Sequence, residues 1–358
     1  MNWSPGFRFF IVGVLAFLMF IPLFFVGAII DDRSNYSRQT IASVSGEWGG
    51  AQIINGPRLV IPVEGPVTRT EQQEVADPVS GEVKKVLVEV TEVSRKAPIY
   101  AYPNGFQATL SSAGEERQRG LFRVPVYAAE LSLGFDFNVD PEKLPTQPNE
   151  TVLWDQTTLD LGVTSNRALR GVAELTLDGR PALLDPATRT NTRTRSGAVS
   201  GIEATIGDPR QIVSFALKLG FNGAQSLMIA PVGRTSEISM TSDWPHPSFT
   251  GAFLPDQSEI TDTGFTARWT IPHLARPLPQ LSRSDVSTAA ANEALGVRFF
   301  QPNDFYQKAY RAARYGILFI ALTFLTVLLI ERSKERPTHP VQYLLIGLAQ
   351  SIFVLLMV

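Results

Sequence analysis

The chain has 358 residues, of which 44% are hydrophobic and 18% are charged, and its formal net charge is -2 at pH 7. A nearly neutral chain lacks the basic surface needed to neutralise phosphates, so nucleic acid is excluded as a partner. The absence of cysteine excludes disulfides, thiolate metal sites and cysteine nucleophiles. Hydrophobic residues concentrate at both ends of the chain, which predicts membrane segments on either side of a soluble middle.

The first apolar segment, Phe9 to Ile30, contains no charged residue. At about 1.5 Å per residue, a helix of this length crosses a hydrocarbon core of about 30 Å, and membrane helices tolerate a proline such as Pro22. A signal peptide cleaved after Val26-Gly27-Ala28 is the alternative, but the apolar run is longer than a typical signal core. We expect an uncleaved anchor at residues 1–30, which residues 33–44 extend as a helical stalk.

The middle of the chain, residues 31–311, alternates apolar and polar residues with a period of two. The clearest runs are ELSLGFDFNV, IVSFALKLGF and VLVEVTEV, in which every second residue is apolar. Turn dipeptides such as Asp178-Gly179 and Asn222-Gly223 separate the runs. Many short strands with such breaks predict a large, mainly β, antiparallel and sandwich-like domain. The basic stretch 188–199 is expected to be a flexible loop.

The C-terminal part contains two further apolar segments, and a Pro-, Ser- and Ala-rich segment, residues 276–294, is expected to be a linker leading back to the membrane. Residues 312–358 are expected to begin a cluster of transmembrane helices, with spans at 312–330 and 343–358. The chain stops inside an apolar segment, which predicts a C-terminal truncation with further spans missing.

Charges near the spans predict the orientation. Arg332, Lys334 and Arg336 lie between the last two spans and favour the cytoplasm for that connector, although Lys308, Arg311 and Arg314 precede the second span. Arg8 before the first span and the acidic pair after it favour a cytoplasmic N-terminus. We therefore expect a multi-pass inner (plasma) membrane protein whose β domain is periplasmic.

The stretch TSDWPHPSFTGAFLP, from Thr241 to Pro255, has the composition of a functional site. A zinc site built from His246, His273 and a carboxylate such as Asp243 or Asp256 is one interpretation, and a serine hydrolase using Ser248 is another. Neither an HExxH nor a GxSxG motif is present. We favour a rigid corner anchored by aromatic residues, because two prolines restrict the backbone. Its residues are Trp244, Pro245, His246, Pro247, Ser248 and Phe249.

A second motif lies at the mouth of the last span and consists of His339, Pro340, Gln342 and Tyr343. Proline suits the first turn of a helix, so His339 is expected to cap the helix. A proton or ligand role for His339 is the alternative. Tyr315 and Tyr343 are placed where aromatic belts form. The span interiors contain no Asp, Glu, Lys or Arg, and so lack the buried charges of a proton-coupled transporter.

Four segments together resemble the CreD inner-membrane family, whose members are also described as cell-envelope integrity or colicin-tolerance proteins. These segments are GPRLVIPV (56–63), TSDWPHPSFTGAFLP (241–255), YGILFIALTF (315–324) and HPVQYLLIGL (339–348). The resemblance implies an N-terminal span, a large periplasmic domain and a C-terminal cluster of spans. It also implies a function in the envelope stress response of Gram-negative bacteria.

No catalytic residue and no cofactor follows from this resemblance, so we expect a non-enzymatic protein without a metal. Its expected partners are the lipid bilayer and an envelope protein, lipid or glycan, and the sequence assigns no oligomeric state. A transporter or lipid-handling protein with a periplasmic gating domain is the alternative function. An enzyme using His246 with Asp243 is a third, less favoured hypothesis.

Overall fold

The computed structural model describes residues 5–76, 83–120, 122–187, 200–299, 305–331 and 339–356. The chain divides into two compact units. One unit combines residues 1–43 with residues 301–358, and the other contains residues 44–300. The stretch 188–199 and most of the connector between the last two spans lie outside the described residues, so the predictions made for them stay predictions.

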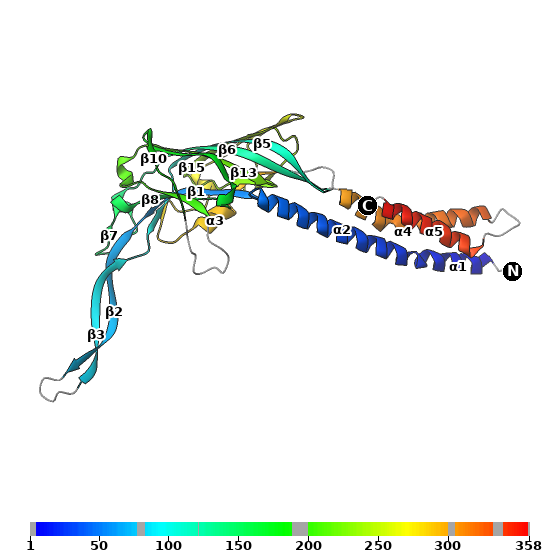
Figure 1. Ribbon diagram of the computed structural model, residues 1–358, viewed down its shortest axis with the longest axis horizontal. Coiled ribbons are helices and arrows are strands. Elements are labelled where there is room, and N and C mark those ends of the chain that lie inside the picture. Colours follow the sequence, from blue (N-terminus) through cyan, green and yellow to red (C-terminus); the bar gives the residue numbers. More distant parts are fainter. Residues whose placement is uncertain are drawn as a thin grey trace. The chain divides into compact units, whose positions relative to one another are not determined.

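The first unit is helical (Figure 1). Its described helices are α1 (Pro5–Leu18), α2 (Phe20–Glu47), α4 (Phe305–Glu331) and α5 (Pro340–Leu356). Two runs are long and apolar enough to cross a membrane, Phe9–Glu47 and Tyr310–Ile330, and α5 is a shorter apolar helix. Helices α1 and α2 are interrupted at Met19, because Pro22 has no N–H to donate to the carbonyl of Leu18.

Helices α1, α2, α4 and α5 pack through a small apolar cluster. Its buried members are Met19, Leu23, Ile320, Phe324 and Tyr343. Many large apolar side chains on the same helices remain exposed, as expected of surfaces that face lipid. The predicted stalk is confirmed, because α2 continues as one helix to Glu47. The predicted membrane boundaries at residues 31 and 311 stay a prediction.

The second unit is built on three sheets, counted over the described residues. The first sheet has the order β11 (Asp185–Pro186), β12 (Gly201–Thr205), β8 (Thr158–Gly162), β1 (Gln52–Ile61), β14 (Ser226–Ile229), β20 (Leu295–Phe299) and β16 (Pro247–Gly251). Strand β4 (Ile99–Ala101) pairs with β1, and β19 (Leu281–Ser282) pairs with β4. The second sheet has the order β10 (Arg180–Ala182), β9 (Leu169–Leu177), β13 (Phe215–Ala224), β6 (Phe122–Phe135), β5 (Gly105–Arg119), β15 (Thr235–Ser242), β18 (Gly264–Ile271) and β17 (Gln257–Thr261).

The third sheet is a long hairpin that projects from the β domain (Figure 1). Strand β2 (Val63–Ala76) pairs with β3 (Val83–Arg95) along its length, and β7 (Thr151–Val152) adds two residues at its base. One short helix, α3 (Ser287–Asn292), and several 3-10 turns complete the described elements of this unit. The 3-10 turns are Pro141–Lys143, Trp154–Gln156, Asn166–Ala168, Pro209–Gln211 and His273–Ala275.

The predicted fold class is confirmed: along the chain, apolar helices precede and follow a large, mainly β domain. Most strand pairs are antiparallel, but β1 pairs with β14 and β5 pairs with β15 in parallel. The two large sheets share one core, to which Leu59, Leu131 and Phe215 all contribute. The alternation predicted for IVSFALKLGF holds only from Phe215 onward. Val213 lies before the start of β13, where its backbone N–H donates to the carboxylate of Asp178 at 3.1 Å. Its side chain is 80% exposed.

Two local predictions are wrong. Asn222-Gly223 is not a turn but lies within β13, where it pairs with Ala128 and Tyr127 of β6. Residues 276–294 are not a linker, because they contain β19 and α3 and return the chain to strand β20. In both places, pairing within a sheet overrides the local preference of the residues for turns and loops.

Candidate functional site

The segment around Trp244 carries the chain from one large sheet to the other. Strand β15 ends at Ser242 in the second sheet, and β16 begins at Pro247, where it pairs with Phe299 of β20 in the first sheet. The Trp244 ring is half-buried and meets the Phe299 ring edge-on, with 6.1 Å between ring centroids. The segment between the two sheets is short, and Pro245 limits its backbone freedom.

Phe249 anchors the other end of this corner. Its ring lies edge-on to Phe265 at 5.6 Å and to Trp269 at 5.9 Å. The carboxylate of Asp243 accepts a hydrogen bond from the backbone N–H of Gly114 at 2.6 Å. These contacts stabilise the backbone of the corner and leave Asp243 engaged by β5.

The two chemically suggestive side chains of the corner, His246 and Ser248, are exposed. The other residues weighed for a metal site do not join them: His273 begins a 3-10 turn, and Asp256 accepts the N–H of Thr270 at 2.6 Å. Among the described residues, no three His, Asp or Glu side chains come close enough to hold a metal ion. The hydrolase and zinc interpretations therefore gain no geometric support.

The membrane-mouth motif forms the start of α5. The N–H of Val341 donates to Nδ1 of His339 at 3.3 Å, and the N–H of His339 donates to Oε1 of Gln342 at 3.3 Å. This reciprocal arrangement resembles a capping box, with Pro340 as the first helical residue. Tyr343 is buried against Phe324 of the neighbouring helix α4, at 5.4 Å between ring centroids.

A groove of about 710 Å³ lies over five adjacent strands of the second sheet, β9, β13, β6, β5 and β15. Its exposed side chains are short or polar and include Ser111, Ala128, Glu130, Ser132, Lys218 and Thr241. Side chains alternate across a strand, so the buried Leu131, Leu219 and Phe221 beneath the groove belong to the core. A smaller hollow of about 270 Å³ shares Thr241 and Ser242 with this groove.

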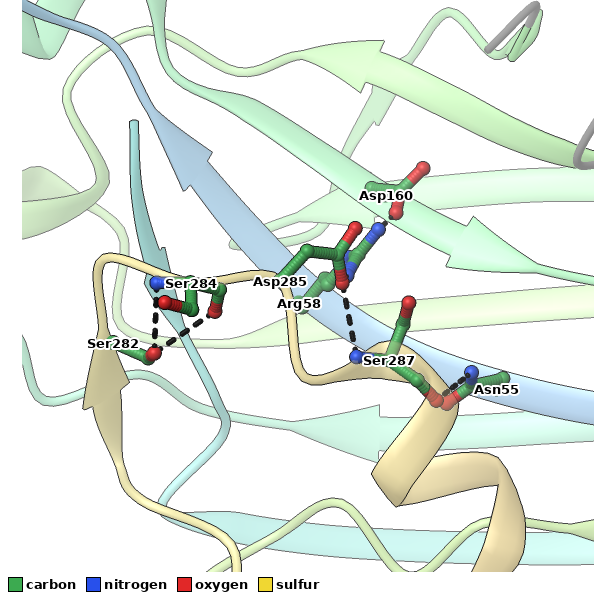
Figure 2. Close-up of polar contacts among 7 residues, drawn as sticks. All are labelled: Asn55, Arg58, Asp160, Ser282, Ser284, Asp285 and Ser287. Carbon is green, nitrogen blue, oxygen red and sulfur yellow. Dashed lines mark hydrogen bonds and ion pairs between the residues drawn. The ribbon is translucent and has the colours of Figure 1, made fainter. Parts of the chain in front are cut away.

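A buried charged cluster occupies the first sheet (Figure 2). Arg58 of β1 donates from Nε to Oδ2 of Asp160 on β8 at 2.8 Å, and from Nη1 to Asp285 before α3. Its guanidinium also lies over the Tyr100 ring, 5.0 Å from the centroid. Asp285 accepts the N–H of Ser287 at 2.9 Å, which ties the start of α3 to the cluster.

The charges in this cluster stabilise one another. Burial alone raises the pKa of Asp285, but the hydrogen bond and positive charge of Arg58, with hydrogen bonds from Ser287, outweigh it and hold that pKa below its usual range. Burial lowers the pKa of Arg58, while Asp160 and Asp285 more than offset it and raise the pKa overall. Arg58 therefore stays a cation that holds three segments together.

Neither the groove nor the Arg58 cluster was predicted from the sequence. The only signal for the cluster was an arginine beginning the otherwise apolar run RLVIPV, which pointed to a charge inside a strand. The groove had no comparable signal, because its side chains come from strands that are distant in sequence.

The family described as "Inner membrane protein CreD" matches residues 4–358. Inner membrane protein CreD of Escherichia coli (strain K12) is 30% identical over 342 residues, which cover 95% of this chain and 72% of that protein. A crystal structure from Legionella pneumophila, provisionally described as a nutrient binding protein, is 8% identical. The likeness covers 73% of this chain and 77% of that chain, with a TM-score of 0.28.

Proposed function

The chain belongs to the CreD family of inner membrane proteins, and from that premise we propose that it supports cell-envelope integrity by binding an envelope component through its β domain, without catalysing a reaction. The binding surface is the groove over β9, β13, β6, β5 and β15. The domain lies on the periplasmic side, where envelope components are accessible, and binding there contributes to the envelope stress response.

The groove is the observation that carries this proposal. Its volume of about 710 Å³ falls within the range of about 300–1,000 Å³ that is usual for ligand sites. The carboxylate that a hydrolytic site would need beside His246 is instead engaged: Asp243 accepts the N–H of Gly114. A surface with room for a ligand, whose described residues show no hydrogen-bonded pair of nucleophile and base, is suited to binding.

Filling the groove tests the proposal. Ala128 is exposed in the groove, so Ala128→Trp should block it without entering the core. Ala216 is exposed on the neighbouring strand β13 and lies outside the groove, so Ala216→Trp is the matched control. In cells that lack the native copy, we expect Ala128→Trp to reach normal membrane levels and fail to relieve envelope stress, while Ala216→Trp succeeds. Full complementation by Ala128→Trp at normal levels would contradict a function that depends on the groove.

Transport or lipid handling is a second candidate, favoured by a polar contact within the helical unit. Nε2 of Gln350 on α5 donates to Oγ1 of Thr323 on α4 at 2.9 Å, and the buried Oε1 of Gln350 has no partner among the described residues. Such polar groups stabilise helix pairs in lipid and also line transport routes. Under this candidate, Gln350→Leu abolishes complementation at normal protein levels, whereas under groove binding the variant still complements.

A further inference from the structure

The side chains facing the groove form two polar rows across the strands. Glu130 of β6 lies opposite Ser111 of β5, which lies opposite Thr241 of β15. In the second row, Glu174 of β9 lies opposite Lys218 of β13, which lies opposite Ser132 of β6. Neighbouring strands are about 4.8 Å apart, so each row places polar groups at regular intervals across the sheet.

We propose that this groove is a glycan site, which binds a short chain of sugars through their hydroxyl groups. The inference rests on the proposed function and names the chemical class of its ligand. Ser and Thr hydroxyls both donate and accept hydrogen bonds, as sugar hydroxyls do, and a carboxylate such as Glu130 accepts from two donors. A site that pairs with hydroxyl groups discriminates strongly against ligands that lack them.

The floor of the groove leaves room for a sugar ring. Ala113 of β5 and Ala128 of β6 face each other across the ladder, and both are exposed. Their short side chains allow a flat ring to approach the sheet closely, while Glu130 and Ser111 stand beside it. Asp243, at one end of the groove, is already held by the N–H of Gly114, so its position is fixed before a ligand arrives.

An extended peptide fits this surface poorly. Peptides that bind to sheets add to an edge strand, where backbone N–H and C=O groups are free. Four of the five strands beneath the groove, β13, β6, β5 and β15, lie between two neighbouring strands in the described sheet, and β9 pairs with β10 over Leu175–Leu177. The exposed groove residues also include no large apolar side chain that would form a pocket for peptide side chains.

Lipid chains and phosphates also fit poorly. An acyl chain would leave the polar groups of the two rows without hydrogen-bond partners, since the rows contain only Ser, Thr, Glu and Lys. Phosphates require an excess of positive charge, but Glu130, Glu174 and Asp243 outnumber Arg170 and Lys218 in the groove. Arg170 is further occupied with the carbonyls of Arg167 and Leu169, each at 2.8 Å.

Titration of the purified full-length protein in detergent with tetra-N-acetylchitotetraose tests the inference, with maltotetraose as a second sugar. We expect saturable binding of at least one sugar by calorimetry, with one site per chain. Ala128→Trp should weaken binding at least tenfold and Glu130→Gln at least threefold. The controls Ala216→Trp and Glu237→Gln, which change exposed residues outside the groove, should bind as the unaltered protein does.

The inference would be overturned by no binding of either sugar, or by equal weakening by the groove variants and their controls. Binding of an extended peptide in place of both sugars would also overturn it. The proposed function is tested separately. If neither sugar binds but Ala128→Trp still fails to complement, the glycan assignment is wrong and the binding function stands. If Ala128→Trp complements fully, the binding function itself is contradicted, whatever the sugars do.

Discussion

Arg58 shows how much one buried side chain contributes to the architecture of the β domain. It is 5% exposed, and its two carboxylate partners belong to β8 and to the segment before α3. A buried ion pair contributes little net stability as a whole, but removing one partner leaves a charge without compensation. The cluster extends through Ser287, whose carbonyl accepts a hydrogen bond from Nδ2 of Asn55 at 2.7 Å (Figure 2). Loss of the Arg58 side chain therefore affects β1 and α3 together.

Replacing Arg58 with methionine should destabilise the β domain by about 3–5 kcal/mol, because the buried Asp160 would lose its counter-charge. The matched control is Arg69→Met, since Arg69 forms its ion pairs with Glu71 and Glu92 on the exposed hairpin. This control should cost less than about 1 kcal/mol. Denaturant unfolding in detergent, followed by tryptophan fluorescence, measures both. A similar cost for the two variants would show that Arg58 has no special structural role.

The lowered pKa of Asp285 predicts that the protein becomes less stable at acidic pH. Its pKa in the folded protein lies below the ordinary value of about 3.9, so its contribution is fully present above that pH. As the pH falls below about 4, the unfolded chain takes up a proton that the folded chain still excludes, and the free energy of unfolding decreases. The contribution is lost once the pH passes below the folded pKa.

The variant Asp285→Asn tests this dependence. It should be less stable than the unaltered protein at pH 7, and its stability should fall less steeply between pH 5 and about pH 3. Unfolding midpoints measured across that range give the comparison. Parallel curves for the two proteins would refute the assignment of this acid sensitivity to Asp285.

At the scale of the elements, the pairing of β6 with β13 depends on one glycine. Tyr127 of β6 lies opposite Gly223 of β13, and its ring covers the glycine. The ring is buried and its hydroxyl donates to the carbonyl of Ser226 at 2.8 Å. An aromatic ring over a strand glycine repairs the packing that the missing side chain would otherwise lose. This contact explains why Asn222-Gly223 continues a strand and does not form the turn that its residue types favour.

Gly223→Ala should therefore destabilise the protein by about 1–3 kcal/mol, because a Cβ at this position overlaps the Tyr127 ring and hydroxyl. The control is Gly134→Ala in β6, where a Cβ meets no heavy atom within 4 Å. That change should be neutral or slightly stabilising, since alanine loses less backbone entropy than glycine on folding. Thermal unfolding of the two variants distinguishes them, and equal midpoints would mean that the ring moves aside at little cost.

At the scale of the whole molecule, the chain combines helices that expose apolar side chains with a β domain that has its own core. Within the β unit, which begins at Val44, Glu47 pairs with Arg119 at 2.8 Å and Arg117 covers the Trp48 ring at 3.8 Å. Nε1 of Trp48 donates to the carbonyl of Tyr127 at 3.3 Å. Glu47 and Trp48, at the start of the β unit, are thus bound to β5 and β6, two of the strands that form the groove.

The proposed orientation has a direct test, because the chain contains no cysteine to interfere with single-cysteine labelling. Ser258 is exposed on β17, so Ser258→Cys should react with a membrane-impermeant maleimide in cells whose outer membrane has been permeabilised. Ser333, in the basic connector before α5, is the matched position, and Ser333→Cys should react only after the inner membrane is opened. The reverse pattern would place the β domain in the cytoplasm and remove the basis of the proposed function.

The sequence by itself determined the main classes of element and their order along the chain: an apolar helix, a mainly β domain and two further apolar helices. The uncharged run from Phe9 to Ile30 indicated a membrane helix, the alternation around Leu131 indicated a strand, and the motifs near Trp244 and His339 indicated the family. Each of these signals is local, because the residues that share one face of a helix or a strand are only two to four positions apart in the sequence. The structural role predicted for His246 in a rigid corner stays a prediction, as does the less favoured chemical role.

Only the tertiary structure decided which residues meet. Arg58 binds Asp160, 102 positions away, and Asp285, 227 positions away, and the groove joins strands between Ser111 and Asp243. Strand order and register bring these side chains together, and both depend on how two complete sheets share a core. Local periodicity predicts that Glu130, Ser111 and Thr241 face solvent, but it contains no information about which strands become neighbours.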